Sequence, residues 1–170
     1  MVSEADGRAA GGRRGSEPVG YMARTQAYYE AQGFERAYRY AHHAEAPFAL
    51  PARPLAECTV GLVTTASVYP RAPLEPRRIE SAPTMPPPAR LYTADLSWDK
   101  KATHTGDVNS FCPIGPLQTL ARQGTIGRLA ARFHCAPTEY SQRTTTLQDA
   151  PGILRRLRED GADVALLVPL

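Results

Sequence analysis

Cysteine is scarce in this 170-residue chain, with only Cys58, Cys112 and Cys135. Their spacing is unpaired, so the sequence does not predict a disulfide framework. Few, unpaired cysteines are typical of a reducing compartment, and we expect a cytoplasmic protein. There is also no Cys-x-x-Cys or His-x-x-x-His spacing. Zinc ligands usually come at such intervals, so we expect no zinc site and assign no metal ligands from this spacing.

Long hydrophobic runs and dense basic runs are absent as well. No apolar stretch approaches the ~20 residues that a membrane-spanning helix needs. The first residues include Glu4 and Asp6 and lack the apolar core of a signal peptide. The net charge of +3 is spread over scattered arginines, without a basic run interleaved with aromatic residues. We therefore expect neither a membrane nor a nucleic acid as partner.

Two motifs of common α/β enzymes are missing. No glycine-rich phosphate loop follows the first predicted strand, which disfavours a free-standing nucleotide binder. No Gly-x-Ser-x-Gly elbow is present, which excludes that way of presenting a serine nucleophile.

The chain has three predicted parts, which are a disordered tail (1–17), an N-terminal helix with its connector (18–57) and an α/β domain (58–170). The N-terminal helix is predicted over 19–32, with Gly33 at its end. A proline-rich excursion interrupts the domain at 70–88, where seven prolines leave no room for a helix.

The order of elements in the domain predicts an α/β fold with a three-layer, mostly parallel open sheet, Rossmann-like and incomplete at the C-terminus. Val164–Val168 is an unbroken apolar run, typical of a strand covered on both faces. We expect Asp149 to cap the start of the helix that lies before this strand. The other predicted elements are strands at 59–65, 90–97 and 126–134 and a helix at 115–123.

Candidate site residues lie where the predicted strands end. Thr64 and Thr65 close the first strand, and their hydroxyls either line a ligand site or cap the next turn. His134 and Glu139 flank the end of a later strand, where an acid/base pair would be placed. The alternative is a loop stabilised by hydrogen bonds. Tyr140 is a further candidate for lining the substrate site.

One polar loop offers a second set of candidates, His104, Asp107 and Asn109. These side chains could bind a metal or a polar substrate. Loops rich in Asp, Asn and Gly also form turns without any ligand, and the sequence leaves both interpretations open.

Several stretches together resemble the selenoprotein B family of the glycine, sarcosine and betaine reductases, which includes the dithiol-dependent D-proline reductase. The matching stretches follow the family's order and lie at 53–66, 106–114, 124–127 and 160–170. The resemblance implies reductive cleavage of a carbon–nitrogen bond in a small amino-acid substrate, with a dithiol as electron donor. It also implies an oligomer with a partner subunit that carries a pyruvoyl group.

The resemblance further implies a selenocysteine or cysteine nucleophile on the loop directly after a strand like Val164–Val168. A low-pKa chalcogen attacks carbon, and a thiol then resolves the intermediate. No such residue is present, because the sequence stops at Leu170. We hypothesise that Leu170 is an artefactual end at a selenocysteine codon, which leaves the chain without turnover. In-frame DNA downstream encoding a Cys/His motif would support this, and non-coding DNA would contradict it. The alternative is a non-catalytic α/β binding or assembly module.

Overall fold

The computed structural model describes residues 20–34, 42–46, 49–70, 78–93, 104–138 and 141–170. The predicted tail at 1–17 lies outside these residues. The chain divides into two compact units, Met1–Ala44 and Glu45–Leu170.

The described part of the first unit is a helix, α1 (Tyr21–Ala31). It ends at Gly33, which has a φ of +85° and donates its N–H to the Glu30 carbonyl. This is the left-handed position that commonly ends a helix, as the sequence predicts. Tyr28 and Tyr29 pack edge to face at 5.8 Å, and Phe34 continues the contact to Tyr29 at 5.7 Å.

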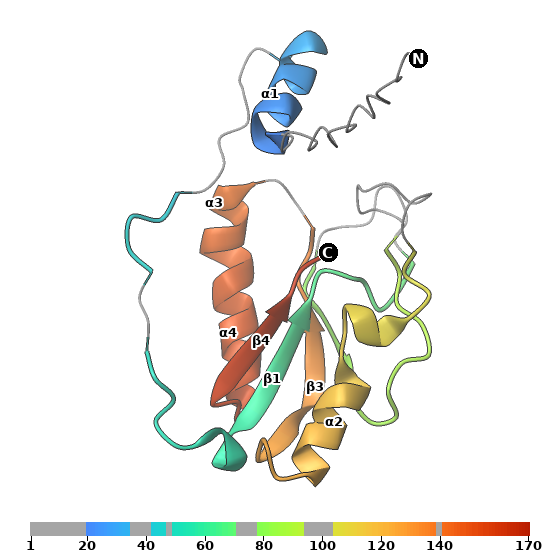
Figure 1. The fold of residues 1–170 in the computed structure, drawn as a ribbon, viewed down its shortest axis with the longest axis vertical. Coiled ribbons are helices and arrows are strands. Elements are labelled where there is room, and N and C mark those ends of the chain that lie inside the picture. The colour runs from blue at the N-terminus through green and yellow to red at the C-terminus, as the bar shows by residue number, and fades with distance from the viewer. Residues whose placement is uncertain (1–19, 35–41, 47–48, 71–77, 94–103, 139–140) are drawn as a thin grey trace, which may run out of the picture. The chain divides into compact units, whose positions relative to one another are not determined.

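The second unit is built on a four-stranded sheet with the order β2-β3-β1-β4 (Figure 1). Its strands are β1 (Thr59–Thr64), β2 (Glu80–Pro83), β3 (Arg128–Cys135) and β4 (Val164–Val168). β1 pairs in parallel with β3 and β4, whereas β2 runs antiparallel to β3. The predicted mostly parallel α/β sheet is confirmed.

Helices cover both faces of the sheet, which confirms the three layers. The principal ones are α2 (Ile114–Arg122) and α4 (Ala150–Glu159). Leu62 of β1 belongs to the core cluster that includes Leu117 of α2. Gly61 faces the other way, where a Cβ would lie 2.4 Å from Leu157 of α4. Because neighbouring strand residues point to opposite faces, α2 and α4 lie on opposite sides of β1.

Smaller helical segments join these elements. They are the 3-10 helices η1 (Leu55–Glu57) and η2 (Val108–Ser110), the short helix α3 (Gln142–Thr144) and the π-helix η3 (Thr145–Asp149). No helix among the described residues is long and apolar enough to span a membrane.

The second strand is not where the sequence predicts it. β2 lies inside the proline-rich excursion, at Glu80–Pro83, and in the predicted strand at 90–97 Tyr92 forms an isolated bridge to Ser67. Residues 94–97 lie outside the described residues. The three residues before Pro83 are free of proline, and an edge strand tolerates a proline at its end.

The start of the last helix also differs from the prediction. Ser141, and not Asp149, caps the helical segment, because its Oγ accepts a hydrogen bond from the Thr144 N–H. Asp149 already has helical dihedral angles and makes no capping bond. Pro151 lies in the first turn of α4, as expected. It has no N–H to bond the Leu147 carbonyl, and the wider π turn directly precedes it.

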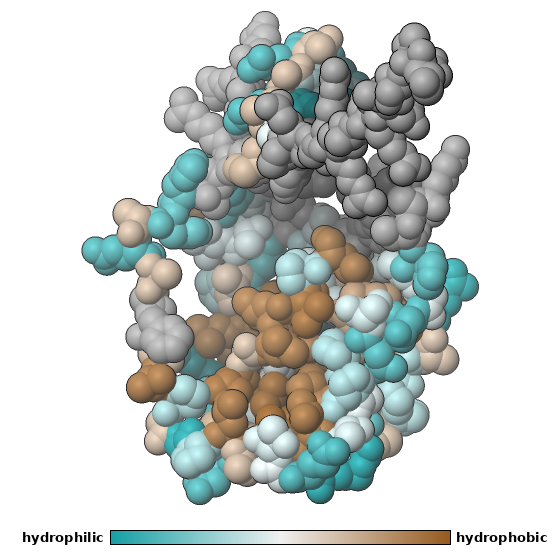
Figure 2. All heavy atoms as spheres, in the orientation of Figure 1, coloured by the Kyte–Doolittle hydropathy of each residue, from teal (hydrophilic) through white to brown (hydrophobic). Residues whose placement is uncertain are grey.

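β4 is an edge strand rather than a strand covered on both faces. Leu166 is 39% exposed on the side of α2, and Leu167 is 65% exposed on the side of α4. β1 is the strand that is covered on both faces, since all six of its residues are buried. Figure 2 shows hydrophobic surface gathered over β4.

Candidate functional site

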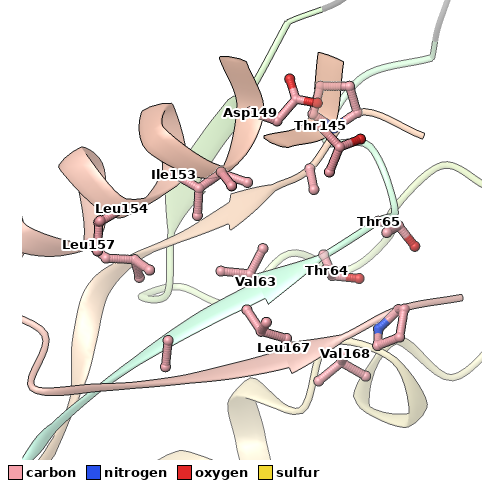
Figure 3. Close-up of a pocket in the computed structure, with 15 residues that line it drawn as sticks. Val63, Thr64, Thr65, Thr145, Asp149, Ile153, Leu154, Leu157, Leu167 and Val168 are labelled. Atoms are coloured by element: carbon pink, nitrogen blue, oxygen red, sulfur yellow. The ribbon is translucent and has the colours of Figure 1, made fainter. Parts of the chain in front are cut away.

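A cavity of about 490 Å³ opens between the sheet and α4, where β1 and β4 end. Figure 3 shows its walls, with Ile153 and Leu157 on the α4 side and Val63 and Leu167 on the strands. Open α/β sheets bind ligands at the carboxyl ends of their strands, so this cavity lies at the expected edge. Its lining residues are Val63, Thr64, Thr65, Ala136, Pro137, Thr145, Asp149, Ala150, Ile153, Leu154, Leu157, Ala165, Leu167, Val168 and Pro169.

The cavity surface is almost entirely apolar, and its four residues with polar side chains come from the end of β1 and from η3. Thr64 and Thr65, both predicted from the sequence, line it together with Thr145 and Asp149. Thr64 also has the alternative role of capping the next turn, because its Oγ1 accepts a hydrogen bond from the N–H of Ala66 at 3.3 Å. The Oγ1 of Thr65 accepts a hydrogen bond from the N–H of Leu170 at 2.9 Å, which joins the chain after β4 to the end of β1.

Sequence reasoning missed Thr145 and Asp149 as lining residues. Asp149 had a role as a predicted cap, and Thr145 lies in a run of threonines without any motif. Their position depends on the π turn, which carries both residues to the mouth of the cavity. The proline at 151 is the one sequence signal for an irregular turn at this place.

His104, Asp107 and Asn109 are not among the lining residues, and each bonds within its own stretch of chain. His104 Nδ1 accepts from Gly106 N–H at 3.2 Å, and Asp107 Oδ1 accepts from Asn109 N–H at 2.9 Å. Asn109 Oδ1 in turn accepts from Gly115 N–H at 3.1 Å. These bonds favour the interpretation as a turn. The described residues contain no group of three or more His, Cys, Asp or Glu side chains arranged to hold a metal.

His134 is fully buried and lies away from the cavity lining. Its Nδ1 is 2.8 Å from Ser81 Oγ, and its Nε2 is 3.2 Å from Asp160 Oδ2 without the alignment of a full hydrogen bond. Arg132 Nε donates a hydrogen bond to Asp160 Oδ1 at 2.9 Å, and its Nη2 forms an ion pair with the same oxygen at 2.7 Å. The group joins β2, β3 and the end of α4. Its partner in the predicted acid/base pair, Glu139, lies outside the described residues, as does Tyr140.

Burial keeps His134 neutral. Desolvation lowers the pKa of this imidazole below its usual 6.5, and the positive charges of Arg132 and Arg156 lower it further. The carboxylate of Asp160 acts in the opposite direction but does not outweigh the burial. A neutral histidine enclosed in this way fits the alternative interpretation of the sequence, in which hydrogen bonds of this residue stabilise the structure and no acid/base pair is formed.

None of the chain's three cysteines is a lining residue of the cavity. Cys58, Cys112 and Cys135 are all buried and reduced. Burial raises the pKa of the Cys112 thiol to about 12, so this side chain is a poor source of thiolate. The described cavity therefore contains hydroxyls and a carboxylate but no thiol.

Comparison with curated proteins finds a relative that acts as a reductase subunit. D-proline reductase subunit gamma from Acetoanaerobium sticklandii is 32% identical over 123 residues, which are 66% of this chain and 49% of the relative. The chain thus spans about half the length of that protein. No family model and no solved structure matches the chain.

This similarity agrees with the resemblance that the sequence motifs indicate. The chain is an α/β protein that is similar in sequence to a subunit of a D-proline reductase.

Proposed function

We propose that residues 1–170 form the substrate-side part of a reductase subunit that takes part in cleaving a carbon–nitrogen bond of a small amino acid. The observation that carries this proposal is the cavity at the carboxyl ends of β1 and β4, in a chain similar to a D-proline reductase subunit. A cyclic amino acid of the D-proline type suits it best. The three methylenes of its ring match the apolar walls of the cavity.

Two kinds of contact would orient such a substrate. Val63, Ile153 and Leu167 offer the apolar surface for the ring. At the other end, the hydroxyls of Thr65 and Thr145 would donate hydrogen bonds to the substrate carboxylate.

The nucleophile of this reaction comes from outside residues 1–170. The buried Cys58, Cys112 and Cys135 do not line the cavity, so a selenol or thiol is brought to it from elsewhere. In the complete reaction a dithiol is oxidised to a disulfide and gives two electrons and two protons. The carbon–nitrogen bond breaks, and carbon and nitrogen each gain one hydrogen. A pyruvoyl group on a partner subunit would supply the electrophile that activates the substrate amine, and a cytoplasmic location would supply the reducing conditions.

Calorimetric titration with D-proline tests the binding step. We expect the wild-type chain to bind D-proline and Thr65→Val to bind about tenfold more weakly, because a hydrogen bond to a charged group is lost. Thr119→Val is the matched control, since Thr119 bonds the Gly115 carbonyl on α2 and does not line the cavity. Absence of binding by the wild type would contradict the proposal.

A dithiol-dependent assay with D-proline, glycine, sarcosine and betaine tests the source of the nucleophile. We expect no turnover from residues 1–170 alone. Turnover by the isolated chain, abolished in Cys58→Ser, Cys112→Ser or Cys135→Ser, would show that one of its own thiols reacts. The alternative function is a non-catalytic assembly module. Such a chain would bind none of the four substrates and would still associate with other proteins. The exposed edge of β4 also favours this alternative.

A further inference from the structure

The α4 side of β4 has an uncovered apolar groove that continues the cavity. Leu154 of α4 is 46% exposed and Leu167 of β4 is 65% exposed, and both line the cavity from facing elements (Figure 3). Leu157 lies deeper between them and is buried. β4 has a strand neighbour on one side, β1, and its other edge faces outward in the sheet.

A helix is the element that would complete the layer at this groove. In α/β domains, helices lie side by side on each face of the sheet, with axes about 8–10 Å apart. α4 covers β1, and within the described residues of the second unit no further helix covers the exposed Leu167 of β4. A helix beside α4 would cover Leu154 and Leu167 together.

The charge beside the groove defines the chemistry of that helix. Arg158 is exposed, lies one turn after Leu154 on the same face of α4, and has no ion-pair partner among the described residues. Arg155 is exposed next to it and contacts Glu159 at a distance of 3.8 Å. An apolar stripe beside two exposed guanidinium groups favours a partner with carboxylates along the flank of its apolar face.

We propose that this groove docks a helix of a partner polypeptide, with one apolar face over Leu154 and Leu167 and carboxylates that pair with Arg155 and Arg158. The relative supports a partner polypeptide as the occupant, because it is named as one subunit, gamma, of its reductase. The inference rests on the proposed function. The docked helix covers the outer part of the cavity, at the exposed Leu154 and Leu167, and leaves the inner part, at Val63, Ile153 and Thr65, as a chamber for a small amino acid.

A labelled amphipathic peptide of about 18 residues, with leucines on one face and glutamates on its flank, is the probe. Fluorescence anisotropy with the full 170-residue chain should show binding that Leu167→Glu weakens about tenfold or more, since a charge enters an apolar contact. Leu147→Glu is the matched control. Leu147 is 63% exposed, so it resembles Leu167 in exposure, but it does not line the cavity.

A second peptide with lysine in place of glutamate tests the charge. We expect it to bind the wild type more weakly than the glutamate peptide, and Arg158→Glu to reverse that order. Equal loss in Leu167→Glu and Leu147→Glu, equal binding of both peptides, or no binding would overturn the proposal. A chain that forms dimers, with Leu167→Glu restoring the monomer, would identify a second copy as the occupant and would also overturn it.

Titration with D-proline separates this inference from the proposed function. Arg158 does not line the cavity, so Arg158→Glu should change the peptide preference and leave D-proline affinity unchanged. Peptide binding without D-proline binding would refute the proposed function alone. The reverse result would refute the docking helix alone.

Discussion

At the scale of single residues, the buried His134 makes stability depend on pH. Its folded pKa is lowered by burial, so the unfolded chain binds a proton more readily. The stability from keeping this imidazole neutral is present above the unfolded pKa of about 6.5 and is lost as the pH falls below it. We predict that the free energy of unfolding falls between pH 7 and 5, by up to about 1.4 kcal/mol per pH unit from this group.

Denaturant titrations at several pH values check this dependence. His134→Gln should flatten the slope below pH 6.5, whereas His104→Gln, in an exposed loop, should leave it unchanged. The same slope in wild type and His134→Gln would show that the acid sensitivity has another origin.

Gly61 is the residue that lets α4 approach the sheet. A Cβ at this position would lie 2.4 Å from Leu157 Cδ2 and 3.1 Å from Ala162 Cβ. We predict that Gly61→Ala lowers the free energy of unfolding by about 1–3 kcal/mol through overpacking. A double-mutant cycle by thermal unfolding isolates the cause. The substitution should be milder in a Leu157→Ala background, and strict additivity would place the strain elsewhere.

At the scale of elements, the start of the last helical segment provides a direct test. Ser141 Oγ accepts from Thr144 N–H at 3.2 Å and also from the Thr144 hydroxyl at 2.9 Å. Ser141→Ala should therefore lower the free energy of unfolding by about 1 kcal/mol. Thr146→Ala, at an exposed position of the π turn, is the control. Equal effects of the two substitutions in chemical denaturation would argue against the capping role.

The sequence predicted elements with strong local signals and failed where tertiary contacts decide. Three local signals each identified an element, namely the apolar runs of β1 and β4 and the glycine, Gly124, that follows α2. β2 is short and polar, and it forms because the edge of β3 pairs with it. Apolar runs alone do not distinguish a central strand from an edge strand, so the uncovered faces of β4 were not predictable.

The candidate site was predictable to a similar degree. Thr64 and Thr65 follow from the rule that ligands bind where parallel strands end, and both line the cavity. His134 follows the same rule, but its side chain contacts Ser81 of β2 and Asp160 at the end of α4 instead of lining the cavity. Thr145 and Asp149 reach the cavity through a π turn, and such a turn depends on packing as well as on Pro151.

At the scale of the whole molecule, the sheet of the second unit has a central strand that is buried and an edge strand that is exposed. β1 is buried on both faces, whereas β4 exposes Leu166 and Leu167 beside an open strand edge. Exposed apolar edges promote association. We predict that the isolated chain self-associates with increasing concentration and that Leu166→Lys reduces this association. Analytical ultracentrifugation measures it, and a monomer at all concentrations would contradict the expectation.

The central claim is that the cavity at the ends of β1 and β4 binds a small amino acid. Amide chemical shifts of the isotope-labelled chain, followed during titration with D-proline, test it most directly. We predict saturable shifts at Thr65, Thr145 and Leu167, with the loop at His104 unaffected. Shifts confined to that loop, or none at all, would contradict the account.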